Sequence, residues 1–197
     1  MSNLDRTKFG DIVEASVTRN AGNEDLIGLQ GTYIAECYDK DGNLKWSDDI
    51  ENLTTNVGRQ NLLNSYFANT GGGAIVMGLM GQTGGSSTPA YTDTQSSHAG
   101  WLEVGNVNAP TYSGTRKTPT FSSATNANPS VLTTSAVVTF AMTSSGTVYG
   151  AFINIGGSTA IDNTTGTLFS AGNFTAGSKT VTSGDTINVT YTLSASG

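Results

Sequence analysis

The stretch "GDTINVTYTLSAS", residues 184–196, alternates between apolar and polar side chains over most of its length. Side chains two positions apart share one face of an extended chain. The apolar face of this stretch consists of Ile187, Val189, Tyr191 and Leu193. A run of this kind, bounded by turn residues, predicts a β-strand with one buried face and one face toward solvent.

The sequence before this strand repeats the same character. Three further stretches are rich in β-branched and aromatic residues, and short runs of Gly, Ser, Thr and Asn separate them: residues 130–143, 146–157 and 166–175. Several strands at such spacing are typical of antiparallel sandwiches and jelly rolls. We therefore predict a mainly β protein, with an antiparallel β-sandwich or jelly-roll-like domain.

The first half of the chain adds two more predicted β elements. Residues 31–50 read as two strands joined by a tight turn at Asp41-Gly42, because Asp-Gly adopts the backbone conformation that a hairpin turn requires. Residues 74–80, "AIVMGLM", form a short apolar run typical of a buried strand. Both elements fit a β-rich domain.

One helix is expected near residues 54–69. Its apolar residues recur at helical spacing and are Val57, Leu62, Leu63, Tyr66 and Phe67. The candidates for its N-cap are Thr54, Thr55 and Asn56. The three glycines at 71–73 end the helix, because glycine accepts the left-handed conformation that follows a helix C-terminus.

We expect a single β-rich domain over residues 29–197, since a domain of this length can bury a large core. Residues 1–28 are polar, mixed in charge and too poor in apolar residues to cover a helix face for long. We expect them to form an arm or a loosely docked segment, with a short helix near residues 11–17.

Composition excludes several functions. Charged residues make up only 12% of the 197, and the net charge of −6 falls entirely within residues 1–51. Without a basic stripe, binding to nucleic acid or to an anionic membrane is not expected. The chain shows neither an apolar signal segment nor a run long enough to cross a membrane. With Cys37 as its single cysteine, it fits synthesis in a reducing cytoplasm.

The stretch "DTQSSHAGWLEV", residues 93–104, concentrates the side chains that could carry chemistry. A catalytic interpretation pairs Ser96 or Ser97 with His98, the only histidine, or uses Asp93 and Glu103 as two glycosidase carboxylates. Neighbouring residues on an extended chain point to opposite sides, and no nucleophile elbow is present. We favour a structural interpretation, with no catalytic residues.

In the structural interpretation each of these residues holds a corner of the fold. Asp93 caps a local turn, His98 bonds a backbone carbonyl, and Trp101 buries its ring where a strand begins. Glu103 is spaced to form an ion pair with Arg116 across a hairpin closed near residues 109–110.

The turn "DKDGN", residues 39–43, resembles a calcium loop only in part. Its glycine, Gly42, is the fourth residue, whereas a calcium-binding EF-hand loop has glycine at the sixth position. A tight hairpin explains these residues, so we predict no metal and no cofactor.

The residues assembled above resemble a family of small structural virion proteins from tailed bacteriophages. The matching stretches cover residues 29–197 in order: "GxYxxECYDKDGNLKWSDDIENLTTNVGRQNLL", "DTQSSHAGWLEV", "PTYSGTRK", "VYGAFI", "GTLFSAGNF" and "VTSGDTINVTYTLS". The third of these contributes Tyr112, which we add to the structural motif of Asp93, His98, Trp101, Glu103 and Arg116.

The resemblance implies a capsid decoration (cement) protein on the virion surface, or a related tail component. The expected partners are the major capsid protein and further copies of the chain, as a homotrimer over capsid seams. Residues 1–28, if they form an arm, would reach a capsid subunit or a neighbouring copy. Two alternatives stay open: a host-recognition adhesin whose loops between 81 and 128 bind a glycan, and a small hydrolase that uses His98.

Overall fold

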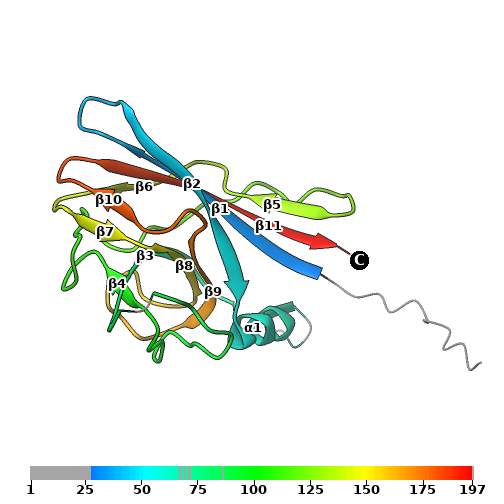
Figure 1. Cartoon of the computed structure of the whole chain (residues 1–197). Helices are drawn as coiled ribbons and strands as arrows, with labels where there is room; N and C mark the ends of the chain where they lie inside the picture. Colours follow the sequence, from blue (N-terminus) through cyan, green and yellow to red (C-terminus); the bar gives the residue numbers. More distant parts are fainter. Residues whose placement is uncertain (1–27, 67, 69, 71, 86, 197) are drawn as a thin grey trace, which may run out of the picture.

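The structure is a computed structural model, and it describes residues 28–66, 68, 70, 72–85 and 87–196. Figure 1 shows a β-rich body with one helix beside the end of the sheet at which β1 begins and β11 ends. The expected arm or docked segment, with its helix near residues 11–17, lies outside the described residues except for Gly28, which begins the first strand.

The elements of the described chain, in order, are β1 (Gly28–Tyr38), β2 (Leu44–Thr54), α1 (Asn56–Tyr66), β3 (Ile75–Gly81), β4 (Leu102–Val104), β5 (Ser130–Thr133), β6 (Val138–Ala141), β7 (Gly146–Val148), β8 (Gly150–Ile155), β9 (Thr167–Phe174), β10 (Lys179–Val181) and β11 (Thr186–Ser196). The main sheet has the strand order β4-β3-β8-β9-β2-β1-β11-β5, with β6 also paired to β11. All of its pairings are antiparallel, and β7 and β10 form a separate pair.

The last strand, β11, organises one half of the sheet. It pairs with β1 along its whole length, from Gly28 opposite Ser196 to Tyr38 opposite Thr186. On its other edge it pairs first with β6 and then with β5. The apolar alternation expected from the sequence is confirmed, since Ile187, Val189 and Tyr191 are buried, and Leu193 is partly buried against the core.

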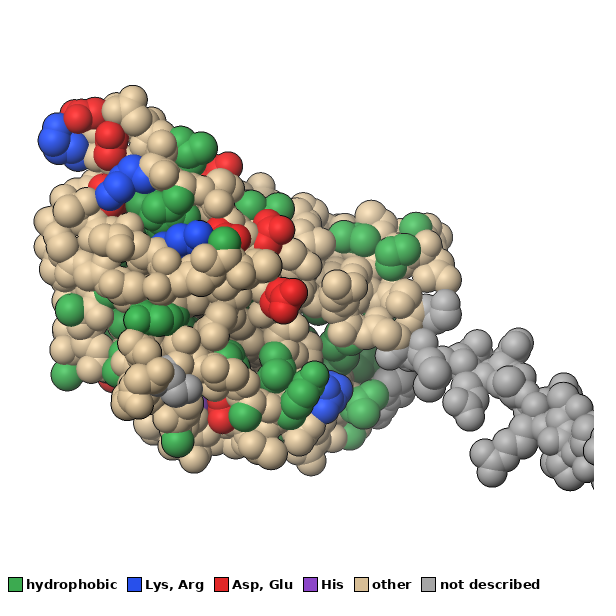
Figure 2. All heavy atoms as spheres, viewed as in Figure 1, with side chains coloured by type: hydrophobic (Ala, Val, Ile, Leu, Met, Phe, Trp, Pro, Cys, Tyr) green, Lys and Arg blue, Asp and Glu red, His purple; other side chains and the backbone are tan. Residues whose placement is uncertain are grey.

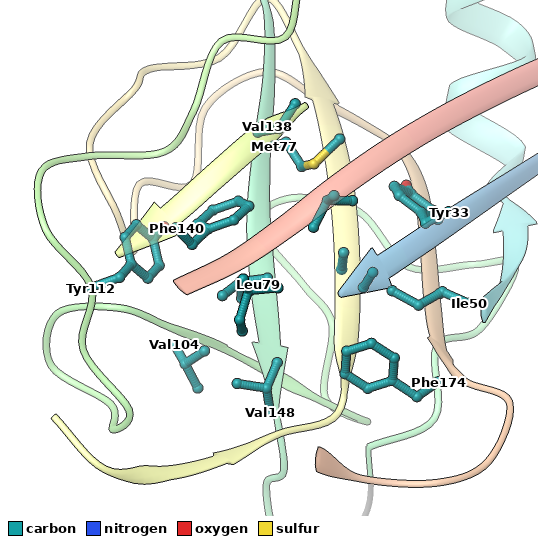
Figure 3. Close-up of a cluster of buried hydrophobic side chains, with 14 of the residues drawn as sticks. Tyr33, Ile50, Met77, Leu79, Val104, Tyr112, Val138, Phe140, Val148 and Phe174 are labelled. Carbon is teal, nitrogen blue, oxygen red and sulfur yellow. The ribbon is translucent and has the colours of Figure 1, made fainter. Parts of the chain in front are cut away.

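The core lies between the two halves of the sheet. One cluster of buried side chains combines Tyr33 and Ile50 of β1 and β2 with Leu79 and Ile153 of β3 and β8. Figure 3 shows Tyr33, Ile50 and Leu79 of this cluster together with Phe140 of β6 around a common centre. The predicted mainly antiparallel, β-sandwich-like fold with one short helix is confirmed, whereas the jelly-roll connectivity stays a prediction.

Three local predictions can be compared with the strands. The hairpin at Asp41-Gly42 is confirmed, with Gly42 in the left-handed region at φ 85°. Residues 130–143 were expected as one strand but form two, because β5 and β6 pair with different parts of β11. Residues 175–184 were expected only to separate two strands, but they contain β10, which pairs with β7.

The helix is confirmed, but its apolar side chains are not buried. Thr55 is the N-cap, because its Oγ1 accepts a hydrogen bond of 3.0 Å from the backbone N–H of Gly58. Gly58 is the one buried residue of α1, whereas Leu62 and Leu63 are 42% and 58% exposed. The helix therefore meets the sheet through its first turn. Neither α1 nor any other helical segment in the described range has the length and apolarity to cross a membrane.

Candidate functional site

Trp101 and Asp93 form the first part of the predicted motif. The Trp101 ring is 1% exposed, and its Nε1–H donates a hydrogen bond of 2.9 Å to Oδ2 of Asp93. The same oxygen accepts a bond of 2.9 Å from the backbone N–H of Ala90, so Asp93 also closes a local turn. A buried indole needs a partner for its N–H, and the loop supplies that partner eight residues upstream.

His98 lies against the same ring. Its imidazole stacks on Trp101 with ring centroids 3.9 Å apart and planes inclined by 17°. Its Nδ1 lies 3.0 Å from the backbone carbonyl oxygen of Trp101. The histidine therefore contacts a backbone carbonyl, as the sequence predicted, and covers one face of the indole.

The serines and carboxylates of the catalytic interpretations have other contacts. Ser96 is exposed and its hydroxyl pairs with Thr94 at 3.2 Å, and Ser97 pairs through its backbone with Thr94. Asp93 bonds the indole of Trp101, whereas Glu103 bonds Arg116. Within the described residues, neither serine forms a hydrogen bond with the side chain of His98.

Glu103 and Arg116 form the predicted ion pair. Arg116 donates from Nε to Oε1 at 2.8 Å and from Nη2 to Oε2 at 2.6 Å. Both side chains are almost fully buried: that of Arg116 is 0% exposed and that of Glu103 is 3% exposed. Such a pair is stable in a low-dielectric interior only when its remaining hydrogen-bonding groups also find partners.

Backbone groups supply those partners from one long loop. Arg116 donates to the carbonyl of Ser158 at 3.1 Å and to that of Asn163 at 2.7 Å. The Oε2 of Glu103 also accepts a bond of 2.8 Å from the backbone N–H of Asp162. The ion pair thereby fixes the connection between β8 and β9.

The hairpin expected to join the two residues is not formed. The backbone of Glu103, in β4, pairs with that of Met80 in β3. Lys117, the residue after Arg116, forms a backbone bridge with Met77 of the same strand. The segments that carry Glu103 and Arg116 therefore lie one after the other along the edge of β3. The side chains of Glu103 and Arg116 meet because both segments lie beside β3.

Phe152 connects the two parts of the motif. Its ring centroid is 5.3 Å from that of Trp101, and the guanidinium carbon of Arg116 lies 5.5 Å from it on the ring face. We call the assembly of Asp93, His98, Trp101, Glu103, Arg116 and Phe152 the Trp101 corner. It packs the long loop that follows β3 against β8.

Tyr112, the sixth predicted residue, lies in the main core instead. Its ring meets Phe140 edge-on at a centroid distance of 5.0 Å. Burial, with a smaller contribution from the charge of Glu103, raises the pKa of the Tyr112 hydroxyl well above its ordinary value. A Cβ at Gly105 would lie 2.3 Å from this ring, so the close approach of the chain here requires glycine.

Comparisons with family models, with curated proteins and with solved structures find no match to this chain. Its function must accordingly be argued from its own residues and from the resemblance of their motifs.

The sequence did not indicate two further polar contacts. Asn154 is fully buried and donates to Oε1 of Gln95 at 2.8 Å and to the carbonyl of Thr165 at 3.1 Å. Lys179 of β10 forms a partly buried ion pair of 2.7 Å with Asp48 of β2. These partners are distant in sequence and belong to no local motif, so no pattern in the chain could have paired them.

The turn at 39–43 uses its polar groups internally. Oδ1 of Asp39 accepts bonds of 2.9 Å from the backbone N–H groups of Asp41 and Asn43, and Oδ2 accepts one from the Asn43 side chain. The hydrogen bonds from Asn43 are the main reason that the pKa of Asp39 lies below its ordinary value. In the described part of the chain, no three His, Cys, Asp or Glu side chains lie together as metal ligands.

Three surface hollows lie away from the predicted motif. Their volumes are about 860, 470 and 280 Å³, and none is lined by a member of the Trp101 corner. The largest lies between α1 and the sheet. The second combines Pro89 and Tyr91 of the long loop with residues of β2 and β9.

Proposed function

We propose that this chain is a bacteriophage capsid decoration (cement) protein. It is made in the host cytoplasm, binds the outside of the capsid shell and stabilises contacts between major capsid subunits. It acts as a homotrimer and without catalytic residues, metal or cofactor. The resemblance of its motifs to virion proteins of tailed bacteriophages is the starting point of this proposal.

The structural observation that carries the proposal is the Trp101 corner. The stretches at 93–104 and 110–117, which carry part of the resemblance, use Trp101, Glu103 and Arg116 for buried internal contacts. These contacts fix long loops on a rigid β domain. A preformed surface loses little conformational entropy on binding, which suits a protein that repeats one contact many times over a shell.

The charge distribution also supports this role. The part of the chain after residue 51 has four acidic and four basic residues, and one pair of them, Glu103 and Arg116, is buried. The cores of protein interfaces are depleted in charged residues. A largely uncharged polar surface therefore favours a protein partner over nucleic acid or an anionic membrane.

Symmetry supports the proposed trimer. Capsid subunits meet at threefold and local threefold positions, and a closed oligomer that shares this symmetry repeats the same contact with every subunit. Mass measurement of the purified protein in solution should give about three times the 20.3 kDa of one chain.

Counting copies in purified virions tests the capsid assignment. On the order of hundreds of copies per particle is the result expected of a decoration protein that follows shell symmetry. Particles that lack the protein should break at lower temperature, and adding it back should restore their resistance. A few tens of copies, confined to detached tails, would overturn the assignment.

The hollow of about 470 Å³ favours a second candidate, a tail-borne host-recognition protein. Tyr91, which is 57% exposed, shares this hollow with Glu51 and Asn173, and the last two pair across β2 and β9. An exposed aromatic ring beside carboxylate and amide groups is suited to a sugar. Binding of glycans that Tyr91→Ala abolishes, together with a tail location, would favour this candidate.

A further inference from the structure

The largest of the three hollows described above is an apolar groove between α1 and the end of the sheet. We define it by Leu29, Arg59, Leu62, Leu63, Leu132 and Leu193, which come from β1, α1, β5 and β11. Its volume is about 860 Å³. In Figure 2, hydrophobic side chains gather over α1 beside a basic side chain.

The groove is continuous with the core. Leu29 and Leu193 pack against the main cluster of buried residues, but they are themselves only partly buried. Leu62 and Leu63, on the other wall, are 42% and 58% exposed. Apolar surface of this extent on a soluble protein generally marks a place where another segment or molecule binds.

The volume indicates what could fill the groove. Pockets for drug-sized ligands measure about 300–1,000 Å³, so the groove can hold several side chains at once. Its wall carries one charged group, the guanidinium of Arg59. The occupant should therefore present several apolar side chains and an acidic group near them.

The composition of residues 1–27 meets these requirements, and in the sequence they end just before the groove wall. They join the described chain at Gly28, one position before Leu29 of the groove wall. Phe9, Ile12, Val13 and Val17 recur at the i, i+3, i+4, i+8 spacing of a helix face. The segment has five acidic and three basic residues, opposite in net sign to Arg59.

The lengths are also compatible. As a helix, residues 9–17 would span about 14 Å, close to the about 17 Å of α1. Residues 18–27 could bridge up to about 35 Å when extended, which is enough for the chain to turn back over the groove.

We propose that the groove is the docking site of residues 1–27 of the same chain, with the apolar face of residues 9–17 packed against Leu62 and Leu63. The sequence left two expectations for the N-terminal segment, an arm or a docked segment, and this proposal selects the docked segment. The proposal does not depend on the capsid assignment.

Cross-linking in the full-length chain tests the proposal. Ile12→Cys combined with Leu63→Cys should be joined within one chain by a short bis-maleimide. The matched control combines Ile12→Cys with Val107→Cys, which is 79% exposed in the loop after β4, at the opposite end of the strand order. Because a docked segment is held at a high effective concentration, the first pair should react at least about tenfold faster.

Two outcomes of this experiment would overturn the proposal. Equal reaction of both pairs would mean that the segment has no preference for the groove. Cross-links formed mainly between chains, seen as dimers on a denaturing gel, would assign the groove to a second copy. The native Cys37 is buried, and the unmodified chain controls for its reaction.

A second measurement does not rely on cysteine chemistry. Phe9→Ser combined with Ile12→Ser in the full chain should weaken docking and expose the groove, so the fluorescence of an apolar dye should rise severalfold. Val107→Ser, which removes an exposed apolar side chain elsewhere, should leave the signal unchanged. Dye binding that is the same in the double variant and the wild type would contradict docking.

Discussion

The guanidinium of Arg116 donates hydrogen bonds to both carboxylate oxygens of Glu103, although both side chains are almost inaccessible to water. Removing one partner of such a pair leaves the other as an uncompensated charge in the interior. The two residues therefore stabilise the fold only together, and this dependence can be measured.

Arg116→Ala should lower the free energy of unfolding by about 3–5 kcal/mol, because the buried carboxylate of Glu103 loses both charge-assisted hydrogen bonds. Glu103→Ala should have a similar effect. Urea denaturation of the two single variants and of the double variant measures the coupling, and the double variant should lose less than the sum of the singles.

The matched control is Lys40→Ala, which breaks an ion pair with Asp41 whose side chains are 73% and 63% exposed. Exposed pairs contribute little, so this change should alter stability by less than about 1 kcal/mol. Equal losses for Arg116→Ala and Lys40→Ala would show that the buried pair does not hold the loops.

Trp101→Ala should lower the free energy of unfolding by about 3–5 kcal/mol, since it removes a large ring that is fully buried. His98→Ala removes only a partly exposed ring that stacks on the indole, so its cost should be about 0.5–1.5 kcal/mol. Thermal and urea unfolding of both variants check this order. A hydrolytic activity of the wild type that His98→Ala abolishes would contradict the structural role.

Elements with local signals could be predicted from the sequence. The hairpin was indicated by Asp41-Gly42, the helix by its apolar spacing and three N-cap candidates, and β11 by its alternation. Each of these signals acts within a few residues. The three-residue β10 has no such signal, because only pairing with β7 makes it a strand. The exposure of Leu62 and Leu63 was also not predictable, since periodicity does not reveal which face of a helix finds a partner.

The candidate site shows the same division. The contact of His98 with a backbone carbonyl was expected as part of a structural corner. The ion pair of Glu103 with Arg116 was predicted from their opposite charges and from a spacing that suits a hairpin. The route of the chain between the last two was wrong, because the edge of β3, rather than a hairpin, brings them together. Phe152, which joins the two parts of the motif, is distant in sequence and could be found only from the fold.

Acid should destabilise the protein partly through Asp185. Burial alone would raise the pKa of this carboxyl, but hydrogen bonds from Lys45 and Thr182 outweigh it and hold the pKa below its ordinary value. A carboxyl whose pKa is lower in the folded state stabilises the fold above its unfolded pKa of about 3.9. That stability is lost as the pH falls through the folded pKa.

Asp185→Asn should therefore lower stability at neutral pH and make the decline below about pH 4 less steep. Urea denaturation between neutral pH and the acid range measures both effects. Lys45→Met removes the same ion pair from the other side and should give the same two changes. Parallel profiles for the wild type and Asp185→Asn would show that another group controls acid unfolding.

Gly58 sets the distance between α1 and the sheet. A Cβ at this position would lie 2.3 Å from the backbone carbonyl oxygen of Phe169 in β9. This oxygen also accepts a hydrogen bond of 3.1 Å from the N–H of Thr55, the residue that caps the helix. The helix can lie this close to β9 only because residue 58 has no side chain.

Gly58→Ala reverses the usual effect of this substitution. Alanine within a helix is normally more stable than glycine by about 0.5–1 kcal/mol, whereas here the added methyl group must push α1 away from a backbone atom. We expect a loss of about 1–3 kcal/mol in urea denaturation, with faster hydrogen exchange of the α1 amides. Gln60→Ala, at an exposed position of the same helix, should change stability by less than about 0.5 kcal/mol. If Gly58→Ala is as stable as the wild type, α1 does not depend on this close contact.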